Sequence, residues 1–372
     1  MCFLYFSPLF FNQEIETERL FYIFVSRNFL SSILTNKLLR KKIRSCEKNM
    51  INTKITEMLN IEYPIFAGNM MNISYPKFTA ACTNACGLGI MASVMFREPE
   101  PLREALKELQ GLTNKPYAVN VNLFPMLRPI NQIDLVKVMI DEGVKIIETS
   151  GHQAPDKYIP LFKENDIVWI HKCAGVRYAK KAAFLGADVV EVVGWENGGA
   201  TGRFDIGTLV LTPATVDAIG VPVVAGGGIA DGRGLVAVLA LGAEAGLIGT
   251  RLLVTQECPI HENLKKALVN ASIYDTTLVM RSLNATHRVW DNAGAQRVLE
   301  LEKSKADQME IFNAAAGAKS KMMYEQGVLD AGIVSCGQGI GLSNDLPTVK
   351  ALFDRIMKEA EEIISNLSKS KI

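Results

Sequence analysis

Short apolar runs alternate with amphipathic stretches along residues 61–270. The apolar runs, rich in β-branched residues, lie at 64–67, 89–92, 118–122, 146–149, 168–172, 189–193, 221–225 and 245–248. Runs of this length that end in polar or glycine-containing turns predict β-strands. The amphipathic stretches predict helices at 77–85, 100–109, 133–141, 156–163, 177–184, 213–218, 232–240 and 261–269. The pattern therefore predicts eight consecutive β-α units.

Glycine marks several of the joints between a helix and the next strand, at Gly143, Gly186 and Gly242. A glycine at a helix C-terminus can adopt the left-handed conformation that ends the helix. Strands that are apolar on both faces indicate a sheet covered by helices. Eight such units predict an α/β fold, a closed (β/α)8 TIM barrel. The alternative is an open doubly wound sheet, which would favour a glycine turn after the first strand, whereas here the glycine turns come late.

Helical patterns dominate after residue 271, at 292–303, 308–315, 320–326 and 349–366. We therefore expect two parts, a barrel over residues 50–270 and a helical appendage over 271–372. A helical appendage over the mouth of a barrel would suit a lid, and a plain side layer is the alternative.

The first 49 residues have a different pattern. Two apolar stretches are interrupted by Glu14, Glu16 and Glu18, and neither reaches the length of about 20 residues that a membrane span needs. Positive charge follows the apolar stretches, which is the reverse of a secretory signal. Our hypothesis is that Met50 is the native start and that residues 1–49 are a non-native or disordered extension.

Composition and charge narrow the class of protein. Hydrophobic residues make up 48% and charged residues 21%, which allows a large core. The net charge of +1 gives no indication of a nucleic-acid partner. Seven cysteines and four histidines show no metal-ligand spacing, so we expect no metal site. Scattered free thiols favour a reduced, cytoplasmic protein.

Glycine-rich turns follow the last three predicted strands. The first is 194–202, which includes Gly199; the second follows Ala225 and is Gly226, Gly227 and Gly228; the third is Gly249 with Thr250. Turns without side chains let backbone N–H groups approach a ligand closely. In a TIM barrel, the loops after strands seven and eight commonly bind phosphate. The sequence therefore predicts a site for a phosphorylated cofactor.

Polar side chains at the ends of other strands suggest the rest of the site. Lys172 ends a buried strand and must meet an anion or a deprotonated ring to stay charged. Asn69, Asn120 and Asn122 could bond a heteroaromatic ring, or each could fix a loop. His152 follows the fourth strand and is a candidate acid or base.

Six segments together resemble the nitronate monooxygenase (2-nitropropane dioxygenase-like) family. They are 64–70 (PIFAGNM), 119–123 (VNVNL), 170–173 (IHKC), 196–202 (ENGGATG), 225–234 (AGGGIADGRG) and 249–251 (GTR). Residues 257–261 and 280–283 further resemble the branch that includes bacterial NADH:quinone reductases. The resemblance covers residue 50 to the C-terminus and implies an FMN-dependent flavoprotein on a TIM barrel.

The family resemblance implies roles for individual residues. Asn69, Met70 and Met71 would line the flavin ring, Asn120 would bond it, and Lys172 would lie beside its N1/C2 edge. The residues that would hold the FMN phosphate are Gly226, Gly227, Gly228, Gly249 and Thr250, with Gly199 and Ala225 beside them.

One position departs from the family pattern. Ala200 occupies the place of the histidine that the family usually has in this motif. Alanine cannot move a proton, so abstraction of a proton from a neutral nitroalkane should be poor, whereas a nitronate is already an anion. Our hypothesis is that His152 substitutes for the missing histidine.

The leading functional prediction is a monooxygenase that oxidises alkyl nitronates with O2. The alternatives are an NAD(P)H-dependent reductase of quinones, an enoyl-thioester reductase, and a flavin-binding barrel without activity. An inosine-monophosphate-dehydrogenase-like barrel would need a cysteine after strand six, and residues 194–220 contain none. We expect small-molecule substrates, no membrane span, and allow a homodimer.

Overall fold

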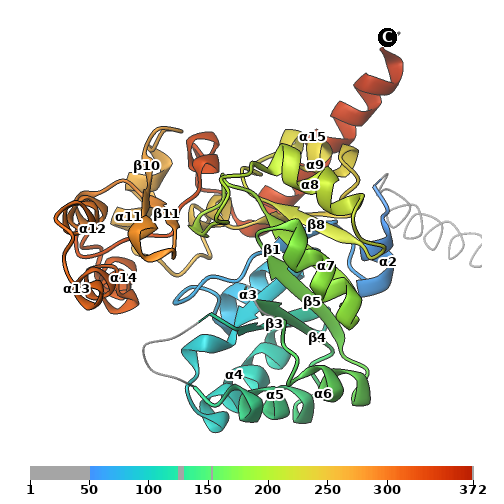
Figure 1. Cartoon of the computed structure of the whole chain (residues 1–372). Helices are drawn as coiled ribbons and strands as arrows, with labels where there is room; N and C mark the ends of the chain where they lie inside the picture. The colour runs from blue at the N-terminus through green and yellow to red at the C-terminus, as the bar shows by residue number, and fades with distance from the viewer. Residues whose placement is uncertain (1–50, 125–129, 152–153, 371–372) are drawn as a thin grey trace, which may run out of the picture. The chain divides into compact units, whose positions relative to one another are not determined.

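Eight parallel strands close into a barrel in the order β1-β2-β3-β4-β5-β6-β8-β9 (Figure 1). The computed structural model describes residues 51–124, 130–151 and 154–370, so the expectation for residues 1–49 lies outside the described residues. The barrel strands are β1 Ile65–Ala67, β2 Leu88–Ala92, β3 Tyr117–Asn122, β4 Ile146–Ser150, β5 Val168–Cys173, β6 Val189–Val193, β8 Val223–Gly226 and β9 Ala245–Ile248. Each predicted strand is present to within two residues at either end, and the predicted TIM barrel is confirmed.

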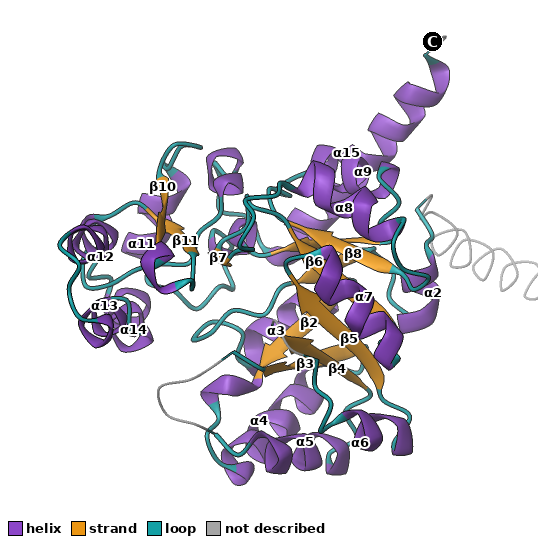
Figure 2. Cartoon of the chain, in the orientation of Figure 1, coloured by secondary structure: helices purple, strands orange, loops and turns teal. Residues whose placement is uncertain are grey.

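Helices alternate with the strands and cover the outside of the barrel (Figure 2). They are α3 Pro76–Asn84, α4 Pro99–Leu112, α5 Gln132–Asp141, α6 Ile159–Glu164, α7 Val176–Leu185, α8 Thr208–Val216, α9 Gly232–Ala240, α10 Thr250–Leu253 and α11 Glu262–Val269. The prediction that a helix begins at Pro213 was wrong, because α8 begins five residues earlier and contains this proline. The carboxylate of Glu196 accepts hydrogen bonds from the backbone N–H and hydroxyl of Thr208 and thereby starts the helix.

The interior of the barrel is apolar toward the N-terminal ends of its strands. Side chains alternate inward and outward along each strand. The inward ones include Phe66, Leu88, Ile146 and Ile170, which share one buried cluster with residues of α2 (Lys54–Leu59), a helix that the sequence analysis missed. The backbone N–H of Lys54 donates to Glu244, just before β9, so α2 lies at the N-terminal end of the barrel.

The C-terminal part contains the expected helices and an unexpected sheet. The helices are α12 Ala293–Lys303, α13 Gln308–Ala314, α14 Gly317–Gln326 and α15 Val349–Lys369. Strands β10 Thr276–Val279 and β11 His287–Trp290 form a hairpin, and β11 also pairs with β7, Gly199–Ala200, from the loop after β6 (Figure 2). The sequence pattern did not predict this sheet, because its strands pair segments that are far apart in the chain and lie among helical patterns. The short β7–β11 pairing anchors the C-terminal part to the barrel.

Helix α15 belongs to the outer layer of the barrel. The backbone N–H of Gly232, at the start of α9, donates to Glu359 of α15 at 2.9 Å. A Cβ at Gly232 would lie 2.6 Å from the backbone nitrogen of Ala360, so the two helices meet at a site that only glycine fits. The last helix therefore packs on the barrel rather than over its mouth.

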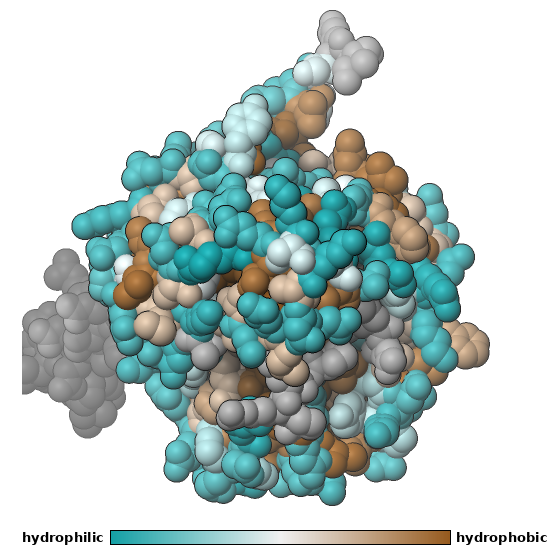
Figure 3. Space-filling view, turned by 60° about the vertical axis from the view of Figure 1, so that its left-hand side comes forward, coloured by the Kyte–Doolittle hydropathy of each residue, from teal (hydrophilic) through white to brown (hydrophobic). Residues whose placement is uncertain are grey.

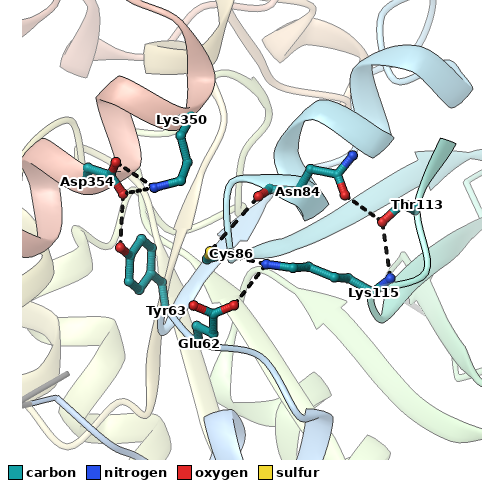
Figure 4. Close-up of polar contacts among 8 residues, drawn as sticks. All are labelled: Glu62, Tyr63, Asn84, Cys86, Thr113, Lys115, Lys350 and Asp354. Carbon is teal, nitrogen blue, oxygen red and sulfur yellow. Dashed lines mark hydrogen bonds and ion pairs between the residues drawn. The ribbon is translucent and has the colours of Figure 1, made fainter. Parts of the chain in front are cut away.

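A polar network joins the N-terminal ends of the first three strands to α15 (Figure 4). The ammonium of Lys115 lies 2.9 Å from Glu62 and 3.3 Å from the sulfur of Cys86. The hydroxyl of Tyr63 donates to Asp354 of α15 at 2.9 Å. This end of a TIM barrel serves stability rather than chemistry, and we assign the network that role.

A helix that spans a membrane must be long and largely apolar. Within the described part of the chain, every helix is too short or too polar to span a lipid bilayer. On the face drawn in Figure 3, hydrophilic residues predominate and hydrophobic ones form small separate patches.

Candidate functional site

A buried ion pair lies inside the barrel toward the C-terminal ends of its strands. Lys172 of β5 and Glu148 of β4 both point inward, because they continue the inward-facing series of Ile170 and Ile146. The Nζ atom of Lys172 lies 2.6 Å from Oε1 of Glu148, whose side chain is fully buried. The anion that a buried lysine at this position requires is therefore Glu148.

The two asparagines predicted to face a ring converge on the same carboxylate. Asn120 of β3 donates to Oε2 of Glu148 at 2.7 Å and to the hydroxyl of Ser150 at 3.0 Å. Asn69, just after β1, also donates to Oε2 of Glu148. Three donors thus bind the side chain of Glu148. The sequence analysis missed Glu148, although an acid within the apolar run 146–149 was the available signal.

A second acid, Glu191, lies beside the ion pair without donors of its own. It is on β6 in register with Lys172 and is fully buried. Within the described residues, no donor binds either of its carboxyl oxygens, and its side chain lies close enough to Glu148 for a protonated Glu191 to donate to that carboxylate. Burial, followed by the negative charge of Glu148, raises the pKa of Glu191 well above its ordinary value. The cluster inside the barrel therefore consists of Lys172, an acid that receives hydrogen bonds (Glu148) and an acid that receives none (Glu191).

The glycine turns after β8 and β9 form a concave backbone surface. Gly227 and Gly228 have φ values of +106° and +75°, which only glycine adopts readily. A Cβ at Gly249 would meet no heavy atom within 4 Å, so space is open at this turn. Helix α10 begins directly afterwards at Thr250, and no side chain caps it. Backbone N–H groups at a helix N-terminus beside open space suit an anion.

The start of α9, which follows Gly228 in the sequence, does not offer such groups. The carboxylate of Asp231 accepts from the N–H groups of Arg233 and Gly234, and Glu359 accepts from Gly232. Two carboxylates already satisfy this helix N-terminus, so it is not an anion site.

A C-terminal segment completes the glycine surface, which the sequence analysis did not anticipate. The short helix η3, Gln338–Leu342, lies against the loops after β6 and β8. The N–H of Gln338 donates to the carbonyl of Glu196, and the N–H of Gly337 donates to the hydroxyl of Thr250 at 2.8 Å. The hydroxyl proton of Thr250 remains available to a ligand.

The methionines after β1 differ in their surroundings. Met70 is half-buried against the core, whereas Met71 is 51% exposed. The side chain of Met71 meets Gly317 of α14, where a Cβ would lie 2.8 Å from the methionine methyl group. A helix of the C-terminal part therefore reaches the loop after β1, at the barrel mouth. That the part as a whole covers the mouth stays a prediction.

Comparison with known proteins identifies the family. The family model described as nitronate monooxygenase matches residues 52–129 and 126–359. The chain belongs to this family. It is therefore an oxidoreductase, and flavin dependence is typical of the family.

Relatives of this chain carry names that differ in activity. A Rhodococcus jostii protein is 32% identical over 85% of this chain and 98% of its own; it is named (3aS,4S,5R,7aS)-5-hydroxy-7a-methyl-1-oxo-octahydro-1H-indene-4-carboxyl-CoA dehydrogenase. A probable nitronate monooxygenase of Staphylococcus saprophyticus is 28% identical over 85% of this chain and 99% of its own. The structure of FabK from Thermotoga maritima covers 86% of this chain and 99% of its own, with 35% identity and a TM-score of 0.80.

Ala200, which we expect at the position of the family's histidine, lies opposite another histidine. It pairs with His287 across β7 and β11, and Nε2 of His287 lies 2.9 Å from the hydroxyl of Ser335. A Cβ at neighbouring Gly199 would lie 3.7 Å from Nε2 of His287. His152 lies outside the described residues. The sequence analysis missed His287 because 87 residues separate it from Ala200.

The remaining described histidines have structural partners. His171 points out of the barrel and is buried, with Nδ1 2.8 Å from the hydroxyl of Thr149. His261 caps α11 by accepting from the N–H of Asn263. No group of three metal-binding side chains occurs in the part of the chain that the structure describes. Its cysteines, at 82, 86, 173, 258 and 336, are free and buried.

Proposed function

We propose that this protein is an FMN-dependent oxidoreductase that oxidises alkyl nitronates with O2. The observation that carries the proposal is the open glycine surface at Gly249, on the same barrel rim as the inward-facing Lys172. Ala200 favours a nitronate over a neutral nitroalkane, because a nitronate needs no base at that position.

The residues present fit a flavin mononucleotide. Gly227, Gly228, Gly249 and the hydroxyl of Thr250 would hold the phosphate, with Gly226, Ala225 and Gly199 shaping the turns. Asn69, Asn120, Met70 and Met71 would surround the ring, and Lys172 would lie at its N1/C2 edge. When bound, FMN would take electrons from the nitronate and pass them to O2.

The chain's own residues would supply charge and position. Lys172 is held as an ammonium by Glu148, and Asn69 and Asn120 fix that carboxylate in turn. A positive charge that is held before the reaction stabilises developing negative charge at no cost of reorganisation. The pair as a whole is neutral, so it tolerates burial while Lys172 attracts an anion.

A second candidate is an oxidoreductase of acyl thioesters that uses NAD(P)H. The observation favouring it is the 32% identity to a carboxyl-CoA dehydrogenase across nearly the whole of that relative. A quinone reductase is a further form of the same reductase activity. In either, a nicotinamide would reduce the bound flavin.

Anaerobic spectroscopy of the purified chain tests these candidates. The visible spectrum should show bound flavin, and released cofactor should run as FMN. Bleaching by propionate 3-nitronate alone supports the monooxygenase. Rapid bleaching by NADH or NADPH instead supports a reductase, and quinone and enoyl-CoA acceptors then separate the two forms. A colourless chain that cannot be reconstituted with FMN would contradict the cofactor assignment.

A further inference from the structure

Glu148 and Glu191 lie on either side of Lys172 but have opposite surroundings. Glu148 receives the Lys172 ammonium and two asparagine amides. Glu191, in register with Lys172 on β6, receives no hydrogen bond from any described residue. A buried carboxylate without a donor is far less stable than the neutral acid. The arrangement therefore stores one proton on Glu191 and leaves Glu148 ionised.

The groups around Glu191 support this distribution of charge. Glu148 on β4 disfavours a second negative charge, and Lys172 on β5 already has a counterion. On the other side, β8 contributes Val224 in register with Glu191, and this side chain carries no charge. Cys173 of β5 is also near, and burial raises the pKa of its thiol to about 12, so it is neutral. The cluster as a whole is neutral.

We propose that Glu191 is a proton store for Lys172. When Lys172 gives its proton to an anion bound at the barrel mouth, the carboxylic acid of Glu191 donates its proton to the neutral Lys172 amine. Lys172 is then an ammonium again, Glu191 is a carboxylate, and the cluster has gained one negative charge. Both transfers rest on the proposed function, because the bound anion is what draws the first proton from Lys172, whereas the resting proton on Glu191 does not depend on it.

Infrared spectroscopy of the resting full-length chain tests the store. At pH 7 the wild type should show the C=O band of a buried protonated carboxyl group. Glu191→Gln should remove the band. Glu148→Gln should also remove it, because Glu191 would then ionise to become the counterion of Lys172. Glu108→Gln, the same chemical change at an exposed helix position, should leave the band intact.

A wild-type spectrum without this band, or a band that survives in Glu191→Gln, would overturn the proposal. Carboxyl NMR of the wild-type chain labelled in its glutamates keeps the test independent of variant folding. One glutamate should remain protonated well above pH 5. If every glutamate is ionised at that pH, the proposal that Glu191 holds a proton is overturned.

Reduction of the bound cofactor by dithionite tests the transfer. The carboxyl band should decrease on reduction in the wild type, and no such change should occur in Glu191→Gln. A band that is unchanged on reduction would refute the transfer. Failure of the chain to bind FMN would refute the proposed function instead, and the resting spectrum would still decide whether Glu191 holds a proton.

Discussion

Ala200 and His287 face each other across the β7–β11 pair, so their side chains lie on the same face of a short antiparallel sheet. Directly opposite residues in such a pair have Cβ atoms about 4.5–5.5 Å apart. The imidazole of His287 therefore lies beside the position where the family usually has its histidine. Burial lowers the pKa of His287 to about 4, so the ring is neutral at pH 7 and can accept a proton.

His287→Ala should impair reactions that begin with proton abstraction. We expect kcat for a neutral nitroalkane to fall by about 10²-fold or more, the usual contribution of a positioned base. Oxidation of the corresponding nitronate should change little, because its proton is already absent. Steady-state rates with each substrate measure the difference.

A parallel His152→Ala variant separates the two candidate histidines. Full turnover in His152→Ala would remove the original hypothesis for that residue. Equal losses on nitroalkane and nitronate in His287→Ala would contradict a role in proton abstraction and indicate a structural role.

Enlarging Gly249 should block the phosphate without harming the fold. Its φ of −119° is open to any residue, and a Cβ there meets nothing within 4 Å. Gly249→Val should therefore unfold at nearly the wild-type temperature but bind FMN at least tenfold more weakly, a cost of about 1.4 kcal/mol or more. Fluorescence titration of the apoprotein measures the affinity.

Gly220→Val is the matched control for Gly249→Val. A Cβ at Gly220 also meets nothing within 4 Å, and this residue lies before β8, at the other end of the barrel. Unchanged FMN affinity is expected. Wild-type affinity in Gly249→Val would place the phosphate elsewhere.

Removing Lys172 should destabilise the barrel more than removing the charge of Glu148. Lys172→Met leaves Glu148 ionised and without its main counterion, a change that costs about 3–5 kcal/mol in buried pairs. Glu148→Gln should cost less, because Glu191 can replace the lost carboxylate. Urea unfolding of both variants and of the double variant measures the coupling. Additive losses would show that the two side chains do not interact.

The buried His171 should weaken the fold in mild acid. Burial lowers its pKa from 6.5 to about 4 in the folded protein. Above pH 6.5 the His171 ring is mostly neutral in both the folded and the unfolded chain, so its titration does not lower the free energy of unfolding. As the pH falls from 6.5 toward 4, His171 becomes protonated in the unfolded chain but stays neutral in the folded one. The free energy of unfolding therefore decreases.

His171→Gln isolates this contribution to acid sensitivity. The variant lacks the titrating ring, so its melting temperature should fall less steeply than that of the wild type between pH 7 and pH 5. The His287 ring has a similarly low pKa and accounts for a further part of the slope. Parallel slopes in wild type and His171→Gln would contradict the assignment.

Local patterns in the sequence were enough to predict the barrel. Each strand is a short apolar run bounded by turn residues, and burial on both faces leaves a parallel sheet as the consistent arrangement. The start of α8 was not readable in this way. It depends on hydrogen bonds that Thr208 donates to the carboxylate of Glu196, twelve positions earlier, whereas Pro213 gave a stronger local signal for a helix start.

In the candidate site, too, some features follow from local sequence patterns and others depend on the tertiary structure. Glycine turns after the last strands and a lysine at the end of a buried strand are local features, so the sequence by itself determined the place of Lys172 at the barrel rim and predicted an anion site there. The partners of Lys172 and Ala200 were decided only by the tertiary structure. Glu148 and Glu191 lie on the strands before and after that of Lys172, and the register of these strands brings the three side chains together. His287 comes from a strand that is distant in sequence from Ala200, and only the pairing of β7 with β11 brings it there.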